Sequence, residues 1–303
     1  MALNNNSAVK VTIIVNSCDA YSDLWDMFFL CLAEYWPECT YPIVLNTEQK
    51  KYYQSIDINF DIRVHNFDSG AVDLWGMRLI STLKETNSTY VIMLYDDFLL
   101  NAPVDHRRIE ALLNLMSGTP SIDVVYLTKL PGVNKGPQDE NGLALLEQGA
   151  DYRLNSAPAI WRRNKLLRFT SKKDNPWAWE YFGSYRTFRV PSVFLAIADS
   201  GEDIYPYDYR KGGAIYRGKW VLEVINPIIK KYKLKINIVD RGTVASNYFP
   251  KRNLQWKISF MTTGIQMIGP RILHVVCRIS KRKIIVFCNY YIKLFKIKIF
   301  NKI

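Results

Sequence analysis

The feature that most restricts the fold of this chain is a regular alternation of two hydrophobic patterns over its first hundred residues. Short apolar runs predict strands at Lys10–Asn16, Tyr41–Leu45, Phe60–Val64 and Thr89–Leu94. Apolar residues at helical spacing predict helices at Asp23–Tyr35 and Leu74–Thr86. Strands that alternate with helices at this spacing form a parallel sheet with helices on both faces, so an α/β fold is expected.

Beyond residue 100 the alternation is less regular. We predict helices at Val104–Met116 and Trp220–Tyr232 and a strand at Val124–Leu127. Residues 131–149 are rich in turn-forming residues and are expected to form a mobile loop. With 49% hydrophobic residues the chain has enough apolar material for a large core, which excludes a disordered protein.

Positive charge is concentrated at the C-terminus. The chain has 40 Lys and Arg against 28 Asp and Glu, a net charge of +12. Residues 241–303 contain 13 of the basic residues and no acidic residue. The charge shift predicts a boundary near residue 240, with a basic, apolar extension at 241–303.

The C-terminal residues 265–303 mix Lys and Arg with aliphatic and aromatic side chains. This composition is typical of a segment that lies on an anionic membrane surface, which is the interpretation we favour. Two alternatives are a nucleic-acid-binding segment and a pair of core helices with solvated lysines. Because no nucleic-acid-binding motif is found, no nucleic-acid partner is expected.

The N-terminus and the cysteines indicate the compartment. Val11–Val15 is too short for the apolar core of a signal peptide, and no window of 18 uncharged apolar residues suggests a membrane-spanning helix. The five cysteines show no paired spacing, and with three histidines a structural zinc site is not expected. We therefore expect free thiols in a reducing cytoplasm.

Asp96 and Asp97 are the most informative residues for function. Two adjacent carboxylates at the end of a buried strand are costly unless something compensates their charge. The carboxyl end of a parallel strand is where ligands bind, and Mn²⁺ or Mg²⁺ favours carboxylates together with substrate phosphates. The alternative is that the two acids cap or solvate a loop.

Glu180 is a second candidate, in the segment Asn175–Tyr181. Trp177 and Trp179 stand just before it, so they could form an apolar wall that raises the pKa of a general base and a surface on which an acceptor sugar stacks. The same segment is also a good helix start, with Asn175 as N-cap and the tryptophans in the core.

Basic residues near these acids could bind a diphosphate. Arg78 lies on the helix that precedes the acid pair, where it could contact a phosphate or solvent. Residues 211–213 are Lys-Gly-Gly, and Arg217 and Lys219 follow on either side of a glycine. This glycine-rich basic stretch suits a flexible clamp, although it has neither Walker nor Rossmann spacing.

The strand that ends at Ser17-Cys18-Asp19, the acid pair in YVIMLYDDF and the downstream WAWE together resemble GT-A-type glycosyltransferases of bacterial capsule and lipopolysaccharide O-antigen clusters. The resemblance covers roughly residues 10–225. It implies a Rossmann-like, mostly parallel central sheet flanked by helices. Residues 1–128 would then bind the nucleotide-sugar and residues 129–240 the acceptor.

The same resemblance implies site roles and partners. Mn²⁺ or Mg²⁺ would be held by Asp96 and Asp97, written DDF rather than DxD, so either acid could be the ligand. Glu180 would be the base of an inverting reaction, and Asn16, Ser17 and Asp19 would lie near the nucleotide with Arg78. The acceptor would be a glycan on a polyprenyl-diphosphate lipid, which places the enzyme at the cytoplasmic face of the cell membrane.

Two other functions remain open at this stage. A nucleotidyltransferase shares the α/β sheet and the metal-binding acids, but the loop Asn16–Ala20 lacks the glycine-rich signature of that class. A non-catalytic peripheral membrane protein would leave the buried acid pair without a purpose.

Overall fold

The computed structural model describes residues 10–54, 56–67, 75–209, 213–245 and 252–280. The chain divides into two compact units, Met1–Lys251 and Arg252–Ile303. The charge shift at residue 240 falls inside the first unit, because β12 (Thr243–Val244) pairs with β11 (Lys219–Val221). The assignment of separate roles to 1–128, 129–240 and 241–303 stays a prediction.

Within the described residues of the first unit, a nine-stranded sheet has the order β3-β2-β1-β4-β8-β5-β9-β7-β6. Its strands are β1 (Val11–Asn16), β2 (Ile43–Thr47), β3 (Ile62–Asn66), β4 (Tyr90–Tyr95), β5 (Ile122–Lys129), β6 (Lys135–Gln138), β7 (Leu143–Leu146), β8 (Ala159–Arg162) and β9 (Val193–Ile197). The five strands expected from the sequence, β1 to β5, are confirmed. A smaller sheet joins β10 (Ile215–Tyr216), β11 and β12.

The sheet is mixed, and seven of its nine strands run in the same direction. β3, β2, β1 and β4 are parallel, as expected, and β5 is parallel to β9. β8 lies antiparallel between β4 and β5, and β7 is antiparallel to both β9 and β6. An antiparallel strand begins at the edge where its parallel neighbours end, so the start of β8 meets the carboxyl end of β4.

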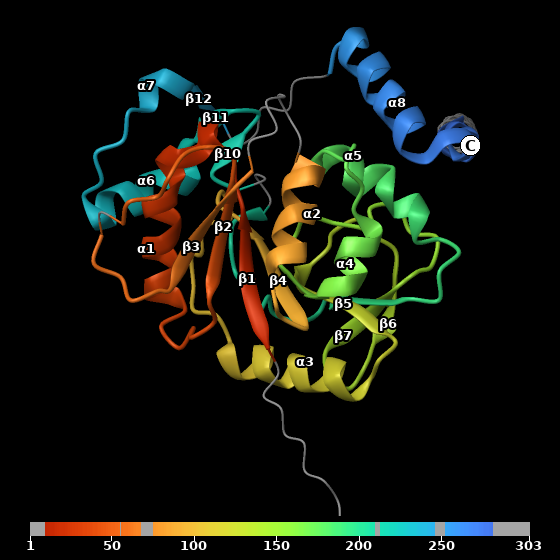
Figure 1. Ribbon diagram of the computed structural model, residues 1–303, viewed down its shortest axis with the longest axis horizontal. Coiled ribbons are helices and arrows are strands. Elements are labelled where there is room, and N and C mark those ends of the chain that lie inside the picture. The colour runs from red at the N-terminus through yellow and green to blue at the C-terminus, as the bar shows by residue number, and fades with distance from the viewer. Residues whose placement is uncertain (1–9, 55, 68–74, 210–212, 246–251, 281–303) are drawn as a thin grey trace, which may run out of the picture. The chain divides into compact units, whose positions relative to one another are not determined.

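Helices cover both faces of the sheet (Figure 1), which confirms the α/β fold. Side chains of β1 point alternately to the two faces of the sheet, so Ile13 and Val15 belong to one core cluster and Ile14 to the other. The first cluster holds residues of α1 (Trp25–Tyr35), α3 (His106–Gly118) and α6 (Leu222–Tyr232). The second holds residues of α2 (Trp75–Glu85), α4 (Arg163–Phe169) and α5 (Pro176–Tyr181). The four helices expected from periodicity are thus α1, α2, α3 and α6.

The expected mobile loop at residues 131–149 is wrong, because β6 and β7 form an antiparallel hairpin there. β7 pairs with β9 and buries Leu143 and Leu146 in the core. Turn-forming residues dominate the segment, so local sequence conceals the strands. Pairing with β9, a long-range partner, is what fixes them.

Short helices complete the chain. η1 (Asp19–Leu24) follows β1, η2 (Gly183–Arg186) follows α5, and α7 (Ile238–Arg241) precedes β12. The second unit contains α8 (Leu254–Ile268), capped by the side chain of Asn253, and η4 (Gly269–Arg271). No helix of the described residues is long and apolar enough to cross a membrane.

Candidate active site

The carboxyl ends of β1 and β4 bring the two predicted loops together. Asn16 pairs with Tyr95 in the parallel register, so Ser17 and Asp96 both follow at the same edge. Met93 pairs with Ala159 across the antiparallel β4–β8 ladder, so Ser156, three residues before Ala159, belongs to the same edge. Three chain segments therefore meet where β4 ends.

Asp96 is buried and held by a hydrogen-bond chain. Only 2% of its surface is exposed. The Ser17 hydroxyl donates to Oδ2 of Asp96 at 2.5 Å, and the indole N–H of Trp25 donates to the Ser17 hydroxyl at 2.7 Å. Burial and the nearby Asp97 raise the pKa of Asp96 well above its ordinary value, although the hydrogen bond from Ser17 opposes the shift.

Asp97 is the more accessible acid of the pair, and burial raises its pKa from 3.8 to about 7. Its backbone carbonyl accepts a hydrogen bond from the amide of Ala214 at 2.8 Å. Gly213 has a φ of +93°, and a Cβ there would lie 2.5 Å from the carbonyl oxygen of Asp97. Only glycine fits this close approach, so residues 213 and 214 fix the turn that carries the acid pair.

The acid pair fits a divalent ion that also binds substrate phosphates. Within the described residues no group of three or more His, Cys, Asp or Glu side chains could hold a metal by itself. Mg²⁺ and Mn²⁺ commonly use one or two carboxylates and take their other ligands from water and phosphate. Burial raises the pKa of both carboxylates, and the charge of Asp97 adds to the shift of Asp96, so a divalent ion would stabilise their charged forms.

Glu180 faces the same region from α5. Asn175 caps this helix by accepting from the amide of Ala178 at 2.9 Å, and Pro176 is its first residue, as the sequence predicted. The Oε1 atom of Glu180 accepts a hydrogen bond from the backbone N–H of Ser156 at 2.7 Å. Burial raises the pKa of Glu180 above its ordinary value, which suits a proton acceptor.

The charges of Glu180 and Asp97 affect the pKa values of the same two tyrosines, Tyr95 and Tyr207. Burial is the main cause that raises the pKa of Tyr95 and of Tyr207, and the charges of both carboxylates add to it. The ring of Phe98 stacks on Tyr207, with centroids 4.5 Å apart. Asp97 and Glu180 are therefore both within electrostatic range of Tyr95 and Tyr207, two residues that the sequence analysis missed.

The two tryptophans beside Glu180 have different environments. Trp179 has no exposed surface, because its ring packs against Trp75 and Trp161 in the core. An acceptor sugar has no access to it, so the prediction of Trp179 as an acceptor residue is wrong. Trp177 is 60% exposed and remains a candidate.

Asn16 and Asp19 hold the loop rather than present free groups to a nucleotide. The Asn16 side chain is buried between strands, donating to the carbonyl of Leu94 and accepting from Asn46, and its place near a nucleotide stays a prediction. The Asp19 carboxylate accepts from the amides of Gln49 and Lys50. Burial acts to raise the pKa of Asp19, but these hydrogen bonds outweigh it and lower the value.

Arg78 is buried and paired. Its guanidinium donates to Glu48 at 2.6 Å and to the backbone carbonyl of Ser17 at 3.0 Å. Glu48 also accepts from the amide of Asp19. Arg78 therefore braces the loop after β1, while Glu48, which directly follows β2, is a site residue that the sequence analysis did not single out. Its position at a strand end was the available signal.

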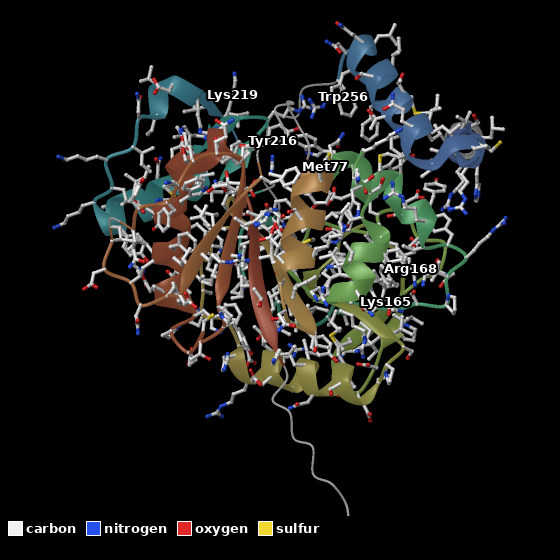
Figure 2. All side chains as sticks on the ribbon, viewed as in Figure 1. Met77, Lys165, Arg168, Tyr216, Lys219 and Trp256 are labelled. Carbon is white, nitrogen blue, oxygen red and sulfur yellow. The ribbon has the colours of Figure 1, made fainter. Side chains whose placement is uncertain are left out.

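Arg217 and Lys219 lie on the exposed turn and second strand of the β10–β11 hairpin (Figure 2 labels Lys219 and Tyr216). The guanidinium of Arg217 lies 5.2 Å from the centre of the Tyr216 ring. Because residues 213 and 214 pack on Asp97, the hairpin starts beside the acid pair. Lys211 and Gly212 lie outside the described residues.

The four cysteines that the structure describes offer no nucleophile at this site. Cys18, Cys31, Cys39 and Cys277 carry free thiols, as expected. Burial, with the charges of Asp96 and Glu48, raises the pKa of Cys18 to about 12. A thiol with such a pKa is protonated at neutral pH and unreactive.

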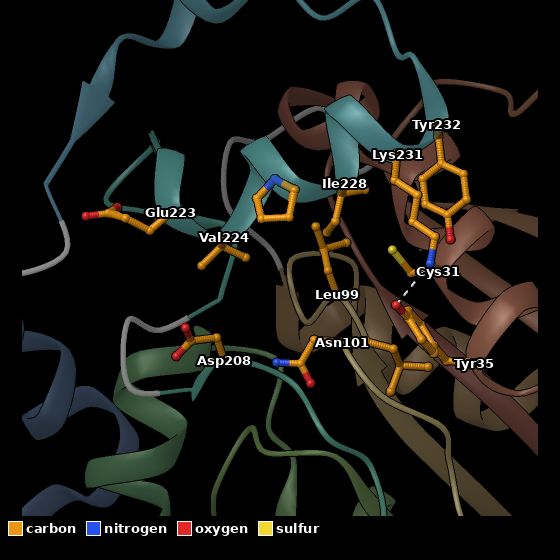
Figure 3. Close-up of a pocket in the computed structure, with 12 residues that line it drawn as sticks. Cys31, Tyr35, Leu99, Asn101, Asp208, Glu223, Val224, Ile228, Lys231 and Tyr232 are labelled. Carbon is orange, nitrogen blue, oxygen red and sulfur yellow. Dashed lines mark hydrogen bonds between the residues drawn. The ribbon is translucent and has the colours of Figure 1, made fainter.

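A separate cavity of about 240 Å³ lies between α1, residues 99–101 and α6 (Figure 3). Its lining includes Leu99, Pro227 and Ile228, with Lys231 and Tyr232 at the α6 end. Asp96, Asp97 and Glu180 do not line it. The cavity is therefore not the site that the acids form.

Comparisons with known proteins identify no family. No family model matches the chain, and no curated protein matches it. Among solved structures, Staphylococcus aureus TarS has 14% identity and a TM-score of 0.43, covering 87% of this chain, which spans only 50% of TarS. A CMP:2-keto-3-deoxy-manno-octonic acid synthetase complexed with CTP has 13% identity and a TM-score of 0.38, covering 64% of this chain and 93% of the synthetase.

The galactosyltransferase LgtC, solved with donor and acceptor sugar analogues, has 11% identity and a TM-score of 0.32, covering 52% of this chain and 59% of LgtC. Identities and TM-scores are low in every case. The architecture described above therefore rests on the strand order and register of this chain itself.

Proposed function

We propose that this protein is a metal-dependent glycosyltransferase that moves a sugar from a nucleotide-diphosphate donor to a glycan acceptor. One observation carries the proposal: the adjacent carboxylates of Asp96 and Asp97 follow β4, and Glu180, a separate carboxylate, is hydrogen-bonded to the N–H of Ser156 at the same edge of the sheet. Phosphate-bound metal chemistry needs the acid pair, and deprotonation of an acceptor hydroxyl needs the separate acid.

In this mechanism Asp97 and Asp96 would hold Mn²⁺ or Mg²⁺ for binding of the donor diphosphate. When bound, such an ion supplies Lewis-acid stabilisation of the leaving diphosphate. Asp97 is the better placed ligand, since it is the more accessible acid and Oδ2 of Asp96 is already bonded to Ser17. The exposed Arg217 and Lys219 supply positive charge for the phosphates beside that turn.

Glu180 is the proposed general base of an inverting transfer. Its raised pKa makes it a stronger base than an exposed glutamate, and the N–H of Ser156 fixes one of its oxygens. The other oxygen is the one proposed to accept the proton of the attacking hydroxyl.

The proposed acceptor is a glycan linked to a polyprenyl diphosphate, reached from the cytoplasmic face of the membrane. Support comes from the second unit, where Leu254, Ile258, Ile265, Leu273 and Val276 are exposed and residues 252–303 contain no acidic residue. Apolar side chains with basic neighbours favour an anionic lipid surface. We expect the full chain to sediment with phosphatidylglycerol vesicles at low salt, and not with phosphatidylcholine vesicles; binding to RNA instead would overturn this assignment.

A thermal-shift screen tests the donor site. UDP, GDP, CDP and dTDP are each added with and without Mn²⁺, and a ligand at 100 times its Kd stabilises the folded state by about 2.7 kcal/mol. We expect one nucleotide to give a metal-dependent shift that Asp97→Ala abolishes and the exposed control Asp57→Ala keeps. No shift with any nucleotide would contradict the proposal.

Donor turnover separates this function from a nucleotidyltransferase. With the sugar nucleotide of the base found in the screen, a glycosyltransferase releases the nucleoside diphosphate. A nucleotidyltransferase would instead consume the nucleoside triphosphate and release pyrophosphate. Release of pyrophosphate would move the protein to that second class.

A further inference from the structure

Exposed aromatic side chains border the segment that carries Glu180. Trp177 is 60% exposed and Tyr152 is 43% exposed. In the described part of the first unit, the exposed large hydrophobic side chains are Tyr53, Leu145, Tyr152, Trp177 and Val239. Two of these five therefore lie on or against α5: Trp177 belongs to the helix, and Tyr152 contacts Tyr181 at its end. Aromatic surface left exposed beside a polar site is typical of a binding surface.

Trp177 and Tyr181 lie on α5 and Tyr152 lies against Tyr181, and we name these three residues the aromatic strip. Trp177 and Tyr181 are one helical turn apart on α5, so their side chains lie on the same face. The ring of Tyr181 lies 5.4 Å from the ring of Tyr152, with an angle of 50° between the ring planes. The strip therefore runs from the start of α5 onto the loop before β8.

Two contacts join this loop to α5. One is the Tyr152–Tyr181 ring contact, and the other is the hydrogen bond from the Ser156 N–H to Glu180. Glu180 directly precedes Tyr181 in the helix. The aromatic strip is thus continuous with the proposed base rather than a separate surface patch.

The backbone at Tyr152 has an unusual conformation. Its φ is +56°, in the left-handed region that L-residues other than Asn, Asp and Gly rarely adopt. Its neighbours Asp151 and Arg153 are buried, and Arg153 donates to the carbonyls of Thr187 and Ser192. The chain is thus anchored on both sides of an exposed tyrosine in a strained conformation, and such strain is concentrated at functional sites.

We propose that the aromatic strip is a subsite for a sugar ring of the glycan acceptor, next to the sugar whose hydroxyl Glu180 deprotonates. The inference rests on the proposed glycosyltransferase function and adds the residues that hold the acceptor. A pyranose has an apolar C–H face that packs on aromatic rings, and Trp and Tyr offer large rigid surfaces with little side-chain entropy to lose.

A protein partner fits the aromatic strip less well. Stable protein interfaces bury about 1,000 Å² or more, whereas one Trp or Tyr side chain buries about 150–250 Å² and Tyr181 is already partly buried. Three rings in a row beside a carboxylate match a small ligand with one apolar face and a hydroxyl rim.

An oligosaccharide array tests the subsite with the full-length protein. We expect the wild type to bind a subset of the printed glycans, and Trp177→Ala and Tyr152→Gly to bind them about tenfold more weakly, since loss of one stacked ring removes roughly 1.4 kcal/mol. Tyr53→Ala, at an exposed tyrosine outside the strip, should bind like the wild type.

The Tyr152→Gly variant distinguishes loss of the aromatic ring from loss of folding as the cause of weaker glycan binding. Glycine adopts a φ of +56° without strain, so this variant should have a Tm equal to or above that of the wild type while it loses glycan binding. Equal glycan binding by the wild type and both strip variants would overturn the proposal. So would a wild type that binds no printed glycan.

The nucleotide screen separates this failure from failure of the proposed function. If the protein shows the Mn²⁺-dependent nucleotide shift but the strip variants bind glycans like the wild type, the proposed donor site is supported and the proposed subsite is refuted. A protein that binds glycans through the strip without any nucleotide shift loses the transferase assignment and keeps a carbohydrate-binding surface.

Discussion

Replacement of Asp97 by asparagine should change how the stability of the metal-free protein depends on pH. Burial raises the pKa of Asp97 from 3.8 to about 7. Each unit corresponds to about 1.36 kcal/mol, so ionisation of this buried carboxyl costs the folded state up to about 4 kcal/mol. Asparagine has nearly the same shape and no charge, so the variant avoids this cost.

The sign follows from proton binding. Between pH values near the unfolded and folded pKa of Asp97, the folded state binds the proton and the unfolded state does not. The contribution of Asp97 to the free energy of unfolding of the wild type therefore falls as pH rises through this window and is constant above it. In Asp97→Asn that contribution is absent, so the variant should gain stability over the wild type as pH increases from about 4 to about 7.

Urea unfolding in EDTA at a series of pH values measures this difference. We expect near-equal stability at the acid end and a variant more stable by up to about 4 kcal/mol above about pH 7. Asp57→Asn, at an exposed aspartate, controls for loss of one charge and should show no such divergence. Parallel pH curves for Asp97→Asn and the wild type would refute the burial of this carboxyl. With Mn²⁺ and the nucleotide present, only the wild type should gain stability.

Three further substitutions test other parts of the site. Glu180→Gln keeps the hydrogen-bond acceptor for the Ser156 N–H and should lower the transfer rate by about two to four orders of magnitude, with nucleotide binding unchanged. In the wild type, kcat/KM should rise with pH around a pKa above that of an ordinary glutamate, and this rise should be absent in the variant. Gly213→Ala should lower stability by more than about 1 kcal/mol and weaken the nucleotide shift, because its Cβ meets the Asp97 carbonyl, while Gly118→Ala, with open space around it, should be tolerated in the same melts. Ser17→Ala leaves a buried indole N–H and a buried carboxylate oxygen without their shared partner, so urea unfolding should show a loss of about 1–3 kcal/mol, and an unchanged midpoint would contradict the hydrogen-bond chain.

Local sequence patterns predicted the first half of the fold well. Each of the first elements is specified by its own residues, because the spacing of apolar side chains within it identifies its buried face. Examples are the β-branched run of β1 and the spacing of Trp25, Phe28, Phe29 and Leu32 in α1. The same holds for the N-cap of α5 at Asn175. The acid pair at the end of β4 could be recognised because a strand end followed by two carboxylates is a local pattern.

The sequence by itself determined that this chain forms an α/β core, that its positive charge lies at the C-terminus, and that Asp96 and Asp97 end a buried strand. Tertiary structure alone decided that β8 inserts antiparallel beside β4, that Trp179 is buried while Trp177 is exposed, and that Ser156 hydrogen-bonds to Glu180. Periodicity records which face of an element is buried, but it does not record the partner that buries it. Strand order and register depend on long-range pairing, and here they bring Glu180 and the acid pair to one edge of the sheet.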